Sequence, residues 1–145
     1  MKEEKLIHLP YSTDSTIKGP IVKNQGIGTS LIVDYDHEQN DGTINITRLE
    51  FKEALAFEYR QSVCCGADRI VSFHDIVCYN KSRWLNEIIK FWNKSVGWQE
   101  WQKQRGSADR FSHYRIFFDD SACIDIISSS VFIKGNIHKD ESLIE

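Results

Sequence analysis

The chain has few residues that interrupt regular structure, and it lacks the patterns that mark export, membrane spanning or low complexity. Only two of its 145 residues are proline, Pro10 and Pro20. No apolar run is long enough for a signal peptide or a bilayer-spanning helix, and no lipidation motif occurs. These absences predict a cytoplasmic protein that does not contact membranes.

The sequence also lacks the motifs of common catalytic and cofactor sites. There is no Gly-x-Ser-x-Gly motif and no phosphate-binding loop, and the Gly26–Gly28 segment lacks the third glycine of a dinucleotide fingerprint. His74 and Cys78 share one face of a predicted strand, with Cys64 and Cys65 nearby, but their spacing matches no zinc site. We therefore expect free cysteine thiols and no metal or cofactor, and we favour a protein that is not an enzyme.

Charge is nearly balanced overall but unevenly distributed. The net charge is −3, which is too small for bulk attraction to nucleic acid. Residues 81–110 carry seven basic and three acidic residues, whereas the segments on both sides are net acidic. The same region holds all four tryptophans: Trp84, Trp92, Trp98 and Trp101. A solvated helix face explains such lysines and arginines, although aromatics interleaved with cations are also typical of single-stranded nucleic-acid binding.

Short strands dominate the rest of the pattern. Hydrophobic residues make up 41% of the chain and aromatic residues 12%, which is enough to build one core without disulfides. We expect one domain over residues 1–135 and a polar tail over 136–145. Alternating or β-branched runs predict strands over 30–36, 43–51, 55–59 and 70–79.

One segment changes to helical periodicity. Ser82 is a suitable N-cap for an amphipathic helix over about residues 83–94. Its apolar stripe consists of Trp84, Leu85, Ile88, Ile89 and Trp92. We expect Trp84 and Trp92 to pack in the core, whereas polar neighbours make Trp98 and Trp101 candidates for an exposed surface.

A C-terminal β-hairpin is predicted from strands over 113–118 and 123–131 on either side of the turn DDSA. A three-residue loop places Arg115 opposite Asp125. One buried face then holds Tyr114, Ile116, Phe118, Ile124 and Ile126. A shift by one residue would bury Asp125 among aromatics at a high desolvation cost, so the first register, with Asp125 outside the core, is preferred.

Together these elements predict an α+β fold. It consists of a mostly antiparallel β-sheet or open barrel of six to eight strands, one main amphipathic helix and the C-terminal hairpin.

Acidic residues crowd two predicted loops and provide a candidate contact surface. Such loops are often only solvated, but they can also meet a basic partner, where charge speeds association and fixes orientation. Together with the two exposed tryptophans, the candidate partner-binding residues are Asp34, Asp36, Glu38, Asp41, Trp98, Trp101, Asp119 and Asp120.

Two segments carry a resemblance to known proteins. The stretch SRWLNEI at 82–88, which follows a strand, and the hairpin HYRIFFDDSACIDII at 113–127 are similar to small bacterial proteins. Some of these look like immunity proteins encoded beside polymorphic toxins. The resemblance implies a one-domain α+β scaffold and toxin neutralisation, and it implies no active residue.

Three functions of different classes follow from these observations. The first is an immunity-type protein that occludes a partner protein, such as a cognate toxin domain. The second is a nucleic-acid binder that uses residues 81–110. The third is a small-ligand-binding protein or enzyme with a pocket in the sheet. The sequence favours the first.

Overall fold

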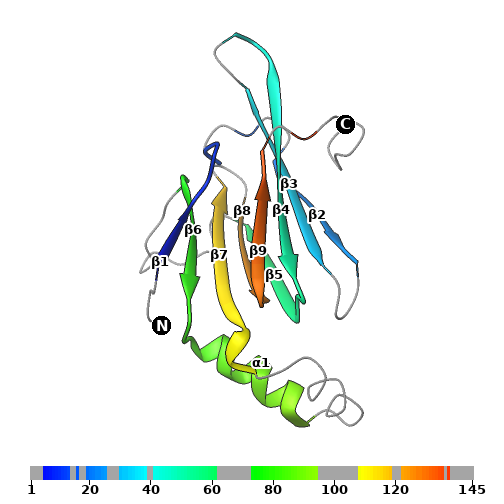
Figure 1. Cartoon of the computed structure of the whole chain (residues 1–145), viewed down its shortest axis with the longest axis vertical. Coiled ribbons are helices and arrows are strands. Elements are labelled where there is room, and N and C mark those ends of the chain that lie inside the picture. Colours follow the sequence, from blue (N-terminus) through cyan, green and yellow to red (C-terminus); the bar gives the residue numbers. More distant parts are fainter. Residues whose placement is uncertain are drawn as a thin grey trace.

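The computed structural model describes residues 5–13, 16, 19–25, 30–38, 41–61, 73–94, 108–118, 122–135 and 137. Within these residues there are nine strands and one α-helix (Figure 1). The strands are β1 (Lys5–His8), β2 (Ile21–Asn24), β3 (Leu31–Glu38), β4 (Ile44–Lys52), β5 (Ala56–Gln61), β6 (Asp75–Tyr79), β7 (Ser112–Phe118), β8 (Ala122–Ser128) and β9 (Ser130–Lys134). The helix is α1 (Arg83–Lys94), and a single 3-10 turn, η2, covers Ala108–Arg110.

The strands form two antiparallel sheets. The first has the strand order β1-β6-β7-β8-β5, and the second has the order β2-β3-β4-β9. Both sheets are open rather than closed into a barrel. The predicted α+β class with mostly antiparallel sheet is confirmed, and nine strands replace the expected six to eight.

The core lies between the two sheets. Tyr35 of β3 meets Phe118 of β7 with ring centroids 5.8 Å apart, and Phe51 of β4 meets Tyr114 of β7 at 5.6 Å. Successive side chains of a strand point to opposite faces, so each of these strands contributes every second residue. Fully buried members include Leu31, Val33, Leu49, Ile76, Ile116, Ile124 and Ile126.

The C-terminal hairpin has the predicted register. Arg115 of β7 lies opposite Asp125 of β8, and all five residues predicted for the buried face belong to the core. The expectation that Asp125 lies outside the protein interior is wrong, because its exposed fraction is 0%. Both faces of this hairpin are therefore buried, and the second face combines the polar His113, Arg115 and Asp125 with the apolar Phe117 and Ile127.

The strand predicted over 123–131 is two strands in different sheets. β8 ends at Ser128, and β9 begins at Ser130 in the second sheet, beside β4. The Ser129 N–H donates a hydrogen bond of 3.0 Å to the carbonyl of Lys52, the last residue of β4. The change of sheet falls within three consecutive serines, Ser128, Ser129 and Ser130, which the sequence pattern assigns to one strand.

Helix α1 has the predicted bounds and the predicted cap. The Leu85 N–H donates to Ser82 Oγ at 3.0 Å, and the Asn86 N–H donates to the Ser82 carbonyl at 3.0 Å. Trp92 is buried and meets the Phe111 ring edge-on at 5.2 Å. Trp84 is half-buried and packs with the same cluster, which also contains Ile127 of β8. The helix thus covers one end of the first sheet, below β6 and β7 in Figure 1.

No helix in the described part of the chain has both the length and the apolar character needed to cross a membrane.

Two further expectations need correction or qualification. Cys78 is a buried free thiol as expected, but Cys123 is disulfide-bonded rather than free. Ile137, which falls in the predicted polar tail, is buried against Ile46 and donates its N–H to the Ile46 carbonyl at 3.1 Å. The remaining residues of that tail lie outside the described ranges.

Candidate ligand-binding pocket

A charged cluster occupies the outer face of the first sheet, away from the core. The strand register places Arg115 of β7, Asp125 of β8 and Glu58 of β5 side by side. Directly opposed residues of antiparallel strands share a face, so the three side chains lie on the same side of the sheet. His113, two residues before Arg115, and Arg60, two residues after Glu58, point to that side as well.

Asp125 is the centre of this cluster. Its Oδ1 lies 2.6 Å from His113 Nε2 and 2.7 Å from Arg115 Nε. Burial raises the pKa of Asp125, but the hydrogen bonds from His113 and Arg115 outweigh burial, so the pKa is lowered from its ordinary value of 3.8. The carboxylate is therefore charged at neutral pH, although it is completely buried.

The His113 ring has a polar partner at each nitrogen and two aromatic neighbours. Its Nδ1 lies 2.9 Å from Ser82 Oγ, the N-cap oxygen of α1. The rings of Tyr79 and Trp84 pack against it with centroids at 5.3 and 5.2 Å. A residue of the helix cap and residues of three strands therefore join in one buried network.

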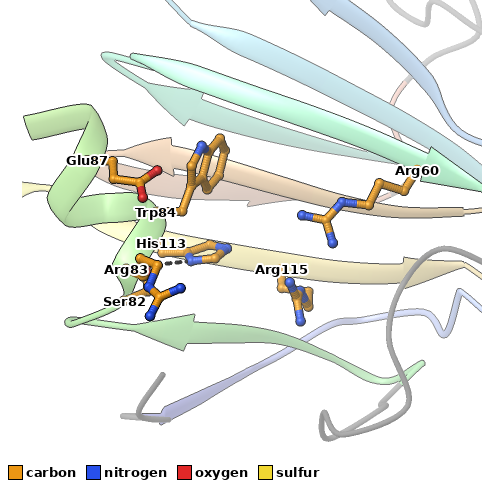
Figure 2. A pocket seen from close by; sticks show the side chains of 7 residues that line it. All are labelled: Arg60, Ser82, Arg83, Trp84, Glu87, His113 and Arg115. Atoms are coloured by element: carbon orange, nitrogen blue, oxygen red, sulfur yellow. Dashed lines mark hydrogen bonds between the residues drawn. The ribbon is translucent and has the colours of Figure 1, made fainter. Parts of the chain in front are cut away.

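A pocket of about 370 Å³ opens beside this network (Figure 2). Trp84 and Glu87 approach it from α1, His113 and Arg115 from β7, and Arg60 from β5. The complete lining is Arg60, Ser82, Arg83, Trp84, Glu87, His113 and Arg115. Three guanidinium groups and an imidazole thus surround the space, with one carboxylate in the lining.

Arg60 forms the partly exposed side of the pocket. Its Nε and Nη2 donate to the two carboxylate oxygens of Glu58 at 3.1 Å each. Its Nη2 also lies 3.8 Å from Asp125 Oδ2, which is ion-pair range but too long for a hydrogen bond. The Arg60 side chain is 31% exposed, so it can reorient toward a ligand.

Arg115 is incompletely satisfied. Its side chain is 2% exposed, and its Nη1 has no hydrogen-bond partner within the described residues. A buried donor without a partner costs about 1–3 kcal/mol, and native structures retain few of them. Asp125 Oδ2 is also buried without a hydrogen bond, so water or another group is needed there as well. A ligand oxygen in the pocket would satisfy the Arg115 donor.

Among the described residues, no three His, Cys, Asp or Glu side chains come together in a way that could hold a metal ion. A second pocket of about 560 Å³ runs along another face of α1. Its lining is Asn80, Lys81, Leu85, Asn86, Ile89, Lys90, Asp109 and Phe111. It contains no buried guanidinium, so the first pocket is the better candidate site.

The structure separates the predicted partner-binding residues. Asp34 and Asp36 are not loop residues: they lie within β3 and are 0% and 1% exposed. Asp34 accepts two hydrogen bonds from Arg48, at 2.9 and 3.0 Å. Because their side chains are enclosed, neither carboxylate can serve as a surface charge for a partner.

Glu38 and Asp41 are exposed, as expected for contact residues, at the end of the β3–β4 hairpin. Hydrogen bonds from the Thr43 hydroxyl and N–H lower the pKa of Asp41. Trp98, Trp101, Asp119 and Asp120 lie outside the described residues. Neither Glu38 nor Asp41 belongs to the pocket lining.

Sequence reasoning missed most of the pocket, although two signals were present. The predicted hairpin register already placed Arg115 beside Asp125, and Ser82 was already identified as the N-cap. His113 joins the hairpin to the helix cap, because it contacts both Asp125 and Ser82. Arg60 reaches the site only through the pairing of β5 with β8, which no local pattern reveals.

Comparisons with protein-family models, curated proteins and solved structures find no match to this chain.

Proposed function

We propose that the protein is a binding module that recognises its partner by capturing an oxyanion, a carboxylate or a phosphate, in the pocket beside Arg115. One observation carries the proposal: the buried Nη1 of Arg115 lines the pocket and lacks a hydrogen-bond partner within the described residues. A guanidinium presents several N–H donors in a plane, which matches the oxygens of carboxylate and phosphate groups.

Charge balance favours a single small anionic group over a polyanion. Asp125 offsets Arg115, and Glu58 offsets Arg60, through the ion pairs already described. Arg83 and Glu87, both from α1, add one charge of each sign to the lining. The pocket therefore offers directed donors without a large positive field, which distinguishes it from an extended nucleic-acid surface.

The partner we propose is a protein. Arg60 lies on β5, the last strand of the first sheet, whose Phe57 and Tyr59 are 41% and 43% exposed. Phe57 and Tyr59 alternate with Glu58 and Arg60, so they lie on the opposite face of this strand. Exposed aromatic residues and arginine are both typical of protein-contact surfaces. An immunity-type protein that neutralises a toxin domain by occlusion, as the resemblance of 82–88 and 113–127 implies, is the specific form of this proposal.

The disulfide of Cys123 bears on the cellular compartment of the protein. Free thiols are expected because the sequence predicts a cytoplasmic protein, whereas the disulfide of Cys123 argues for an oxidising compartment. Fractionation of the native cells tests this point: recovery with periplasmic or secreted markers contradicts a cytoplasmic protein, and recovery with cytoplasmic markers supports it.

An anion titration tests the pocket directly. Sodium phosphate and sodium acetate, compared with sodium chloride at equal ionic strength, should stabilise the protein in chemical denaturation. The gain should reach about 2.7 kcal/mol when the anion concentration is 100 times its dissociation constant. Arg115→Gln and Arg60→Gln should reduce the gain, whereas Arg48→Gln, which alters the closed pair with Asp34, should keep it.

Equal stabilisation of wild type and Arg60→Gln by phosphate would contradict anion capture in this pocket, and so would no stabilisation of wild type. Arg60 is the more secure probe because its partial exposure makes misfolding of the variant less of a concern.

Binding to a candidate partner, the protein encoded by the neighbouring gene, tests whether the partner is a protein. A one-to-one complex that phosphate displaces supports the proposal. Binding that falls steeply with salt on single-stranded DNA or RNA, without a protein complex, would replace it with the nucleic-acid function.

A further inference from the structure

We propose that Ser82, His113 and Asp125 form a hydrolytic relay that cleaves an ester bound in the pocket. Ser82 would be the nucleophile, His113 the base and Asp125 the carboxylate that orients the base. This activity goes beyond binding, and it rests on the proposed function only for the preference for an anionic ester.

The relay has the contacts that nucleophilic catalysis requires. Ser82 Oγ lies 2.9 Å from His113 Nδ1, and His113 Nε2 lies 2.6 Å from Asp125 Oδ1. The Nε2–H donates to the carboxylate, which leaves Nδ1 free to accept the serine proton. Such relays occur in unrelated folds and in different chain orders, so they are identified by geometry rather than by a sequence motif.

Ser82 lines the pocket, although its overall exposure is 5%. A hydroxyl has one proton and two lone pairs. The proton can be donated to His113, and one lone pair accepts the Leu85 N–H at 3.0 Å. The second lone pair remains for attack on a substrate carbon. The cap bond also places Oγ at the positive end of α1, which stabilises negative charge on the oxygen.

Asp125 is suited to orient His113. It is fully buried, and Arg115 holds the same oxygen that His113 contacts, at 2.7 Å. The carboxylate therefore stays in one position and fixes the ring tautomer.

Donors for the developing oxyanion come from the same turn and from Arg115. The N–H groups of Arg83 and Trp84 belong to the first turn of α1, where backbone donors have no partner within the helix. Arg115 Nη1 supplies a further buried donor in the pocket. Donors fixed in a water-poor site contribute strongly to acyl transfer.

The reaction proceeds in two balanced steps. Ser82 Oγ bonds to the acyl carbon while its proton moves to His113 Nδ1, and the C–O bond to the alcohol breaks as His113 returns that proton to the departing oxygen. Water then attacks the acyl-serine and gives its proton to His113. The bond from the acyl carbon to Oγ breaks, Ser82 regains a proton from His113, and a carboxylic acid leaves.

A neutral fluorophosphonate probe tests the serine without relying on anion recognition. The wild-type chain should gain one covalent phosphonyl group, located at Ser82 by peptide mass spectrometry. Ser82→Asn, whose side-chain oxygen can still cap α1, should gain none. His113→Gln should react about 100–10,000 times more slowly, which is the usual loss when a general base is removed. Ser129→Ala, which removes a hydroxyl that donates to the Lys52 carbonyl away from the pocket lining, should react at the wild-type rate.

The outcomes separate the two proposals. An unmodified Ser82 in a folded wild-type chain, or modification of another residue instead, would show that the network is structural and the relay hypothesis wrong. If phosphate still stabilises that chain, anion binding stands. Labelling at Ser82 that phosphate slows supports both proposals, and labelling that phosphate leaves unchanged supports the relay alone.

Discussion

Two arginine–aspartate pairs occupy corresponding positions on the outer faces of the two sheets, and they differ in completeness. Asp34 and Asp125 are both 0% exposed. Arg48 donates two hydrogen bonds to Asp34, to Oδ1 and Oδ2, and the Arg48 side chain is 22% exposed. Arg115 reaches Asp125 with one hydrogen bond, is 2% exposed and retains a donor without a partner among the described residues.

The difference separates a structural pair from a candidate functional one. A two-point arginine–carboxylate contact satisfies both partners and leaves little capacity for a ligand. The one-point contact of Arg115 leaves a buried donor without a partner among the described residues, which costs stability. Buried groups whose hydrogen bonds are incomplete call for an explanation, and the adjacent pocket provides one.

The largest expected effect comes from neutralising the aspartates. Asp125→Asn leaves Arg115 charged and enclosed, so we expect a loss of about 3–5 kcal/mol in the free energy of unfolding. Asp34→Asn should cost less, about 1–3 kcal/mol, because Arg48 can reach water. Urea denaturation at pH 7 measures both. Equal losses would show that the two pairs are equivalent.

Acid should reduce the contribution of Asp125 to the free energy of unfolding. Its pKa is lower in the folded protein than the ordinary 3.8, so its stabilisation is complete above pH 3.8 and is lost as pH falls through the folded value. The difference in stability between wild type and Asp125→Asn should therefore be large at pH 7 and shrink as the pH drops below 3.8. Urea denaturation at a series of pH values measures this, and a difference that grows with acid would refute it.

Replacing both Arg115 and Asp125 should destabilise the protein less than replacing Asp125 alone. Arg115→Met with Asp125→Leu leaves no enclosed charge, so we expect the double variant to recover about 1–3 kcal/mol relative to Asp125→Asn. The recovery is limited because His113 loses its acceptor. A double variant less stable than Asp125→Asn would show that the cluster stabilises the fold beyond this pair.

The smallest expected effect comes from Glu58, which contacts the exposed side of the cluster. Arg60 lowers the pKa of Glu58 mainly through their hydrogen bond. Glu58→Gln should change stability by less than about 0.5 kcal/mol because exposed ion pairs contribute little. It should nevertheless raise phosphate affinity about threefold by removing a negative charge beside Arg60. Isothermal titration calorimetry checks this, and weaker binding would indicate that Glu58 positions Arg60.

Local patterns in the sequence were sufficient for the helix and the hairpin. The N-cap at Ser82 and the apolar stripe defined α1, and the hairpin register followed from the face that had to be buried. These predictions succeeded because each depends on residues close together in the chain. The break at Ser129 was missed because apolar residues stand on both sides of the three serines 128–130, and serine is compatible with a strand as well as with a break.

The candidate site depended on contacts that are distant in the chain. The clustered acidic residues predict a loop surface, yet Asp34 and Asp36 belong to a strand whose two faces are both covered. Burial of the second face cannot be read from alternation, because a polar residue at an enclosed position looks the same as a solvated one. Asp125 illustrates the same point, since it is enclosed by His113 and Arg115 of β7 and by neighbouring residues of β5.

The chain passes between the sheets twice near Lys52. β4 continues into β5 through three residues, β8 continues into β9 through Ser129 alone, and the Lys52 carbonyl accepts hydrogen bonds from Ser128 and Ser129. This junction fastens one margin of the sandwich, whereas the four-residue strands β1 and β2 end the sheets at the other margin. Transient opening should start at β1 and β2, so their amide protons should exchange with solvent before those of β4 and β8.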